Sequence, residues 1–159
     1  MSRPPRIPGF SYVGRQRYFL TICTFKRQKS FACPQTVLDT LLQFRKTAAT
    51  EAFELSAYCF MPDHVHFLIE GLEAWSDFKR FCKMAKQSSG SVHAHRQGGR
   101  LWQEGYYDRV LREGDNVRTV ARYLLNNPVR AGLVATPIDF PYLGSDRWTV
   151  EELIDASQI

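Results

Sequence analysis

Hydrophobic and polar residues alternate in four short runs, and such period-two alternation predicts β-strands. The first run, residues 17–25, mixes β-branched and aromatic residues and ends in a charged, turn-like stretch. Residues 53–60 and 64–70 form two more runs joined by Met61-Pro62-Asp63. Since proline cannot donate a ladder hydrogen bond, this tripeptide is the expected connection of an antiparallel hairpin. The fourth run is the second half of residues 102–112.

Three other stretches repeat apolar residues every three or four positions, which predicts amphipathic helices. The first begins at Pro34 and extends to Ala49. The third covers residues 116–127, with Asp115 as its expected N-cap and Pro128 as its stop. The second has its apolar stripe at Trp75, Phe78, Cys82 and Ala85.

The resulting order of elements is βαββαβ followed by a further helix. This order predicts an α+β fold of the ferredoxin-like type, in which two helices cover one face of an antiparallel sheet. Residues 88–100 are rich in glycine and serine, which favours a mobile loop. We divide the chain into a basic N-terminal arm (1–16), one domain (17–135) and an irregular C-terminal tail (136–159) with a short helix near Thr149 to Ala156.

Composition fits one globular domain, since 44% of the 159 residues are hydrophobic and 23% are charged. Such a chain buries enough surface to fold without disulfides or a structural metal. The net charge of +5 favours a polyanionic partner, of which nucleic acid is the first candidate.

The four cysteines, Cys23, Cys33, Cys59 and Cys82, show no regular spacing, so we expect reduced thiols. No apolar run approaches a membrane span, and the N-terminus lacks the apolar core of a signal peptide. We therefore expect a cytoplasmic protein that does not contact a membrane and that joins the nucleoid when it binds DNA.

His64 and His66 lie two residues apart on a predicted strand, so both imidazoles should point to one face. That geometry can provide two ligands to a divalent ion and leave coordination positions open for substrate. The alternative is a pair of half-exposed sheet residues with ordinary hydrogen-bond partners. His93 and His95 repeat the spacing, but their glycine- and serine-rich surroundings predict loop surface instead.

Tyr123 falls outside the apolar stripe of the third helix, where most tyrosines are simply surface residues. Next to a metal site, however, its phenol could attack a phosphodiester, because a divalent ion polarises the phosphate and stabilises the developing charge. Asn127, four residues later, could supply an oxygen as a third ligand. Its alternative role is a helix C-cap.

Two blocks carry a resemblance to a known family. The block from Tyr58 to Leu68, YCFMPDHVHFL, resembles the HUH motif of single-tyrosine transposases. The block from Tyr123 to Val134, YLLNNPVRAGLV, resembles the tyrosine block of their REP-associated branch. Both occur in the order found in that family, and the likeness extends from about Tyr18 to Val134.

This resemblance implies a ferredoxin-like nuclease that nicks single-stranded DNA near a hairpin through a 5′-phosphotyrosine link. On that pattern, His64 and His66 bind Mg²⁺ or Mn²⁺, Asn127 is a further ligand, and Tyr123 on the additional helix is the nucleophile. Many insertion-sequence relatives carry glutamine in place of Asn127. Those relatives are typically dimers, whereas the REP-associated branch can act as a monomer, so either a monomer or a homodimer is implied.

Basic residues of the arm and of the second helix could follow a phosphate backbone, although a solvated surface explains them equally well. We assign to this role Arg3, Arg6, Arg15, Arg17, Lys79, Lys83 and Lys86. Trp102, Tyr106 and Tyr107 could stack on unpaired bases, but we expect at least two of them in the core. Two other functions remain open: a silent nucleic-acid-binding module, and a hydrolase in which metal-bound water attacks the phosphate.

Overall fold

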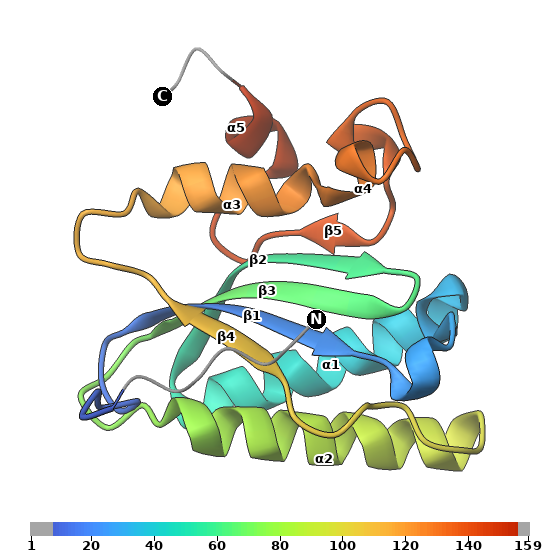
Figure 1. The fold of residues 1–159 in the computed structure, drawn as a ribbon, viewed down its shortest axis with the longest axis horizontal. Coiled ribbons are helices and arrows are strands. Elements are labelled where there is room, and N and C mark those ends of the chain that lie inside the picture. Colours follow the sequence, from blue (N-terminus) through green and yellow to red (C-terminus); the bar gives the residue numbers. More distant parts are fainter. Residues whose placement is uncertain (1–7, 156–159) are drawn as a thin grey trace.

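The computed structural model describes residues 8–155 and shows a five-stranded antiparallel sheet of order β4-β1-β3-β2-β5 (Figure 1). The strands are β1 (Arg17–Cys23), β2 (Phe53–Met61), β3 (His64–Gly71), β4 (Tyr107–Val110) and β5 (Leu143–Gly144). The α-helices are α1 (Pro34–Glu51), α2 (Phe78–Arg96), α3 (Val117–Leu125), α4 (Asn127–Arg130) and α5 (Val150–Ile154). Short 3₁₀ turns lie at Phe25–Arg27, Ser30–Ala32 and Pro137–Asp139.

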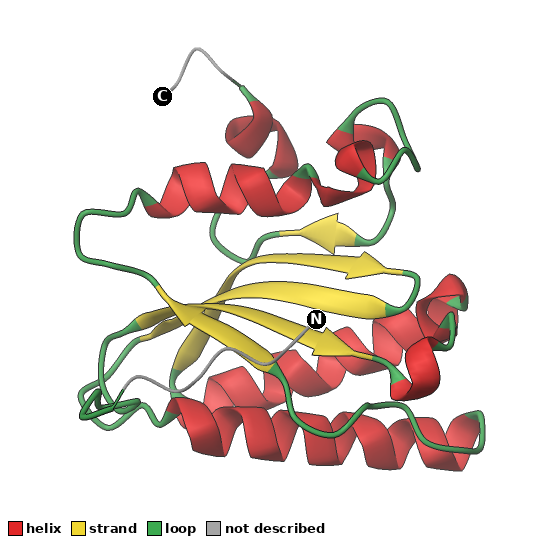
Figure 2. Cartoon of the chain, viewed as in Figure 1, coloured by secondary structure: helices red, strands yellow, loops and turns green. Residues whose placement is uncertain are grey.

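The first six major elements, β1-α1-β2-β3-α2-β4, follow the predicted βαββαβ order. Helices α1 and α2 cover one face of the sheet, and α3, α4 and α5 lie on the other (Figures 1 and 2). The predicted ferredoxin-like α+β fold with an additional helix is therefore confirmed. Pro62 and Asp63 form the tight connection between β2 and β3, which pair from Met61 and His64 onward.

Each face of the sheet has its own hydrophobic core. On β1, Tyr18, Leu20 and Ile22 are buried toward α1 and α2, whereas the alternate residues point to the other face. A second cluster on that other face joins residues of β2 and β3 to the apolar side of α3. The amphipathic pattern of α3 thus places it on β2 and β3, with its polar side outward.

The predicted mobile loop at residues 88–100 is wrong over most of its length, because α2 continues to Arg96. Packing against Trp102 stabilises this serine- and glycine-containing part of the helix. The Trp102 Nε1 donates to the Ser89 Oγ at 2.9 Å, and the ring lies against the face of α2 at Gly90. Tertiary contacts thus outweigh the weak helix propensity of these residues.

Two helix starts also differ from the prediction. Asp77 caps α2 by accepting from the Arg80 N–H, so the helix begins at Phe78. Trp75 therefore lies before the helix, where it is 58% exposed. Asn116, rather than Asp115, caps α3 through the Thr119 N–H, and the Asp115 carboxylate instead accepts from the Arg112 N–H. Both caps are short polar side chains, and Asn116 lies one residue after the cap expected at Asp115.

The C-terminal segment is more ordered than its sequence predicts. Residues 143–144 add β5 to the sheet, where Leu143 pairs with Cys59 and Gly144 with Tyr58. The short helix expected near Thr149 is confirmed as α5, which begins with a capping box between Thr149 and Glu152. Since Leu153 is fully buried in the second core cluster, this segment is an integral part of the α3 layer.

The described part of the N-terminal segment packs on the domain. Tyr12 is buried, and its carbonyl accepts from the Phe78 N–H at the start of α2. A side chain at Gly71 would collide with the Gly14 carbonyl, which shows how closely this segment crosses the end of β3. Among the described helices, none has the length and apolar character that crossing a bilayer requires.

Candidate functional site

The two strand histidines lie on the sheet face that carries α3. His64 and His66 alternate with Val65 and Phe67, which are fully buried on the α1/α2 face. Their ring centroids are 4.8 Å apart, with the rings nearly perpendicular. The period-two prediction that both imidazoles share one face is therefore correct, and their spacing suits two ligands of one ion.

Each imidazole is held through its Nδ1 atom. The His64 Nδ1 lies 2.7 Å from the Asp63 Oδ1, and the His66 Nδ1 lies 2.9 Å from the Thr21 Oγ1. A carboxylate only accepts, so the His64 Nδ1–H donates and Nε2 is the nitrogen left to face an ion. Metal-binding histidines are typically oriented in this way, with the remaining nitrogen directed at the ion.

Asp63 is itself held in place. The Arg27 Nε donates to the Asp63 Oδ2 at 3.1 Å, and the Thr24 N–H and hydroxyl both donate to the Asp63 carbonyl. Burial raises the pKa of the Asp63 carboxyl, but the hydrogen bonds from Arg27 and His64 outweigh burial and lower the pKa below its usual value. The group therefore stays ionised as the acceptor for His64.

Arg27 reaches Asp63 from a strained stretch of backbone. Both Lys26 and Arg27 adopt left-handed conformations, with φ of 52° and 53°. Such conformations cost on the order of 1–3 kcal/mol each in non-glycine residues and persist only where surrounding contacts enforce them. Here the Thr24 hydroxyl bridges the Gln28 and Asp63 carbonyls, and the turn brings the Arg27 side chain to the Asp63 carboxylate.

His66 is neutral at physiological pH. Burial first, then the charges of His64 and Arg130, lower its pKa from 6.5 to about 3. The opposing thiol of Cys59, its register partner on β2, has a pKa raised to about 12 by burial. The site thus presents an unprotonated imidazole beside a protonated thiol, and the imidazole is the available ligand.

Tyr123 projects from α3 on the same side of the sheet. Ala121, Leu124 and Leu125 of this helix are fully buried against the second core cluster, whereas Tyr123 is 59% exposed. The prediction that this tyrosine lies outside the apolar stripe is therefore correct. The guanidinium of Arg130 in α4 lies 3.9 Å from the centroid of the Tyr123 ring.

Asn127 begins α4, directly after the α3 C-cap at Asn126. Its Nδ2 donates to the Leu124 carbonyl at 2.8 Å, so its amide nitrogen satisfies a carbonyl at the end of α3. The expected capping role thus occupies only the donor half of the amide. The Oδ1 atom is the half that could bind a metal.

The predicted DNA-contacting residues of α2 differ in their surroundings. Lys79 and Lys83 are exposed on α2, on the opposite side of the sheet from the histidines. The Lys86 Nζ donates to the carbonyls of Gln103 and Gly105, at 3.1 and 2.7 Å, and so ties α2 to the segment before β4. Its ammonium group is therefore already hydrogen-bonded within the protein, and its predicted contact with phosphate stays a prediction.

The arginines of the first 17 residues differ in their contacts. Arg3 and Arg6 lie outside the described residues. Arg15 makes a long, exposed ion pair with Glu73 at 3.8 Å, and Arg17 donates to the carbonyls of Asp115 and Arg112. Arg15 and Arg17 nevertheless line one groove of about 1310 Å³ at the β4 edge of the sheet.

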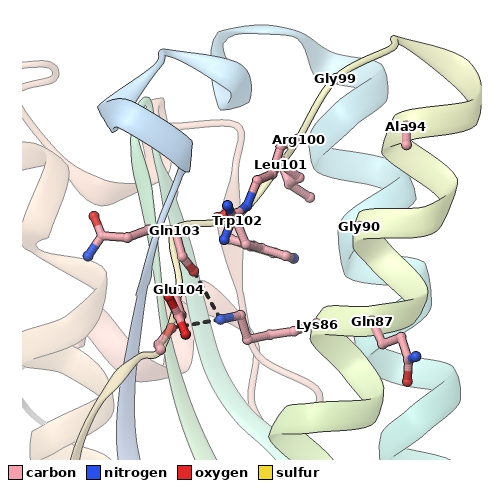
Figure 3. A pocket seen from close by; sticks show the side chains of 11 residues that line it. Lys86, Gln87, Gly90, Ala94, Gly99, Arg100, Leu101, Trp102, Gln103 and Glu104 are labelled. Carbon is pink, nitrogen blue, oxygen red and sulfur yellow. Dashed lines mark hydrogen bonds between the residues drawn. The ribbon is translucent and has the colours of Figure 1, made fainter.

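A separate cavity of about 650 Å³ lies between α2 and residues 99–105 (Figure 3). Lys86 reaches across it to the carbonyls beyond Trp102. Neither histidine of β3 lines it, and its contacts serve to attach the chain after α2 to the helix. We assign it a structural role.

Sequence reasoning missed three residues of the site. Thr21 and Arg27 come from β1 and the turn after it, more than 35 residues before the histidines that they support. Arg130 follows Tyr123 by seven residues, but α3 ends between them and Arg130 belongs to α4. Only Asp63 gave a local signal, as a carboxylate adjacent to His64. Within residues 8–155, no three His, Cys, Asp or Glu side chains gather into a metal-binding cluster.

The chain is similar to two proteins named as transposases. A chain of Haemophilus influenzae named as a REP-associated tyrosine transposase is 26% identical over 141 residues, covering 79% of this chain and 77% of the relative. The REP-associated tyrosine transposase of Escherichia coli K12 is 27% identical over 98 residues, covering 61% of this chain and 57% of the relative. These relatives belong to the branch that the tyrosine block resembles.

Solved structures show the same fold. The REP-associated tyrosine transposase bound to a REP hairpin superposes with a TM-score of 0.73 at 22% identity, over 90% of this chain and 82% of the other. A transposase from Deinococcus radiodurans gives a TM-score of 0.55 at 24% identity, over 68% of this chain and 88% of the other.

The family model "Transposase IS200 like" matches residues 12–127. That range begins at the buried Tyr12 and ends at Asn127, so it contains both histidines, the helix of Tyr123 and the whole ferredoxin-like sheet up to β4. Because the match extends over most of the sequence, the chain belongs to the IS200-like transposase family.

Proposed function

We propose that this chain nicks and rejoins single-stranded DNA beside hairpins, with Tyr123 as the nucleophile. The observation that carries the proposal is the arrangement on one sheet face: two imidazoles, each held at Nδ1, lie on the face of β3 that packs against α3, the helix from which Tyr123 projects. The hairpin-bound solved structure and the REP-associated relatives support hairpin DNA as the partner.

In the proposed reaction, the Tyr123 Oη forms a bond to the scissile phosphorus while the bond from phosphorus to the 3′ oxygen breaks. The tyrosine loses its proton, the departing 3′ oxygen gains one, and a 5′-phosphotyrosine ester results. Attack by a 3′-hydroxyl on this ester reverses the step and restores the tyrosine. Arg130 holds the phenol ring from one side during both steps.

HUH transposases generally use a divalent metal ion. The residues present fit one: His64 and His66 would supply Nε2 atoms, and the Asn127 Oδ1 would supply an oxygen. Mg²⁺ or Mn²⁺, which accept oxygen ligands from phosphate and water, are the ions we propose. When bound, the ion would polarise the scissile phosphate and stabilise the negative charge that develops on it.

Binding outside the reaction centre would rest on basic side chains. We propose that Lys79 and Lys83 on α2, together with Arg15 and Arg17, contact phosphates of the hairpin or its flanks, with Arg3 and Arg6 as further contacts. Such contacts would weaken binding at higher salt without discriminating between sequences. A monomer or a homodimer could present this surface.

Covalent capture tests the proposal. A labelled hairpin oligonucleotide incubated with the protein and Mn²⁺, then denatured, should remain attached to the chain. Tyr123→Phe should abolish the attachment and retain binding, whereas Tyr58→Phe and Tyr106→Phe should still form it. Cleavage by Tyr123→Phe without attachment would identify a hydrolase that uses water, and binding with no cleavage by the unmodified protein would identify a silent module.

A further inference from the structure

The sheet face that carries the histidines is covered on only one half. On β2 and β3, residues of this face such as Cys59 and Leu68 are fully buried under the α3 layer. On β1 and β4, the same face presents Phe19 and Tyr107, which are half-buried, and Arg109, which is exposed. A strip of sheet therefore lies open beside the metal-binding candidates.

Strand register places this strip in line with His66. Thr21 pairs with His66 on one side and with Tyr107 on the other, so the three residues form one row across β3, β1 and β4. Phe19 pairs with Arg109 in the next row. The ring centroids of Phe19 and His66 are 5.5 Å apart. The Arg109 Cζ lies 5.9 Å from the centroid of the Phe19 ring.

The other aromatic residues of this segment do not share the face. Trp102 is 5% exposed and bonded to Ser89, and Tyr106 packs against Phe78 in the core under α2. Of the three aromatic residues that the sequence offered for base stacking, only Tyr107 points to the histidine side. This distribution agrees with the expectation that at least two of them are core residues.

Arginine side chains lie around the strip. Arg27, in the turn after β1, pairs with Asp63 beside His64, and Arg130 of α4 lies on the Tyr123 ring. Arg109 also lines the groove of about 1310 Å³ at the β4 edge, which contains Arg15, Arg17 and Arg112 and three carboxylates. The open strip thus continues from the histidines into an arginine-lined groove, as a path for a polyanion would.

We infer that Phe19, Tyr107 and Arg109 form a stacking platform for unpaired DNA bases next to the scissile phosphate. This inference rests on the proposed function and assigns the part of the site that holds the single-stranded DNA. Flat aromatic side chains stack on any base, so the platform supplies affinity and direction with little sequence preference. Arg109 adds a phosphate contact at the point where the DNA passes from the sheet surface into the groove.

A binding cycle tests the platform separately from chemistry. The Tyr123→Phe protein, which cannot cleave under the proposed function, is titrated with a fluorescent hairpin carrying a single-stranded flank, and with the same hairpin whose flank is abasic. Tyr107→Ala in this background should weaken binding of the intact flank by about tenfold, in the range typical for one stacked base. The same substitution should leave affinity for the abasic flank nearly unchanged.

Matched controls use residues outside the strip. Trp75→Ala removes an exposed aromatic side chain before α2 and should not change either affinity. Tyr107→Phe should retain the affinity that Tyr107→Ala loses, since the ring suffices for stacking. Equal losses on intact and abasic flanks, or no loss in Tyr107→Ala, would overturn the inference.

A second measurement does not depend on a folded variant. The unmodified protein is photo-crosslinked to a hairpin with 5-iodouracil in its flank, then digested with trypsin. Crosslinks should map to Phe19 or Tyr107; crosslinks confined to the α2 peptides that carry Lys79 and Lys83 would overturn the platform. Covalent capture by the unmodified protein reports on the proposed function alone, so its failure and that of the platform are distinguishable.

Discussion

The Arg130 guanidinium stacks on the Tyr123 ring at 3.9 Å, and its Nη2 donates to the Tyr123 carbonyl at 2.8 Å. One side chain therefore holds both the ring and the backbone of the proposed nucleophile. Together with burial and the charge of His64, the charge of Arg130 also lowers the pKa of His66. It lies at the end of α4, which begins at Asn127 directly after α3 ends at its C-cap Asn126.

Arg130→Ala should slow covalent adduct formation while leaving hairpin affinity nearly unchanged. An exposed cation–π contact contributes about 0.5–1 kcal/mol, so loss of the ring contact alone predicts a slowing of about two- to fivefold in single-turnover experiments. Arg147→Ala is the matched control, because Arg147 stacks on Trp148 at 4.6 Å, away from the histidines. A change in affinity with an unchanged rate would contradict the positioning role.

Thr21→Val should raise the Mn²⁺ concentration needed for half-maximal cleavage. Removing the hydroxyl leaves the His66 Nδ1 without its partner, and loss of such a support typically costs 10–100-fold in metal affinity or activity. Thr21→Ser keeps the hydroxyl and should remain close to the unmodified protein. The readout is the dependence of the cleavage rate on Mn²⁺ concentration. An identical curve for both variants would exclude a role of the Thr21 hydroxyl in holding His66.

The two histidine pairs should differ completely in their effect. Replacing His64 and His66 by alanine should abolish cleavage, whereas replacing His93 and His95 should leave the rate of cleavage nearly unchanged. His93 and His95 lie in the last turns of α2, on the opposite side of the sheet. The reverse result would show that the metal-binding pair is in the helix.

Leu153→Ala should destabilise the whole domain. The side chain is fully buried in the cluster under α3, and truncation of such a residue costs about 2–5 kcal/mol. Ile138→Ala, at a 54% exposed position of the same segment, should change the free energy of unfolding by less than about 0.5 kcal/mol. Urea titration measures both, and equal small effects would mean that the segment is an appendage.

Thiol labelling should distinguish Cys33 from the other cysteines. All four are free, and Cys33 is the one that is not buried. Hydrogen bonding from Thr36 lowers the pKa of Cys33, so its thiolate forms at a lower pH than that of an ordinary cysteine. Burial raises the pKa of Cys59 to about 12. Near pH 8, iodoacetamide should modify Cys33 first, and Cys33→Ser should remove the fast phase.

The sequence by itself determined the local elements and the direction of their side chains. Period-two alternation placed His64 and His66 on one face, and the apolar stripe of residues 117–125 left Tyr123 outside it. These predictions were correct because a side chain's direction within one strand or helix follows from backbone geometry alone. The βαββαβ order likewise limited the fold to a few arrangements, of which the ferredoxin-like one was confirmed.

Only the tertiary structure decided which elements meet. Packing of Trp102 on Gly90 extends α2 through a segment that reads as a loop, and pairing with β2 makes a strand of Leu143 and Gly144. Pairing of β1 with both β3 and β4 brings Thr21 and Tyr107 into one row with His66. No local pattern carries this information, because it depends on strand register and on which half of the sheet α3 leaves open.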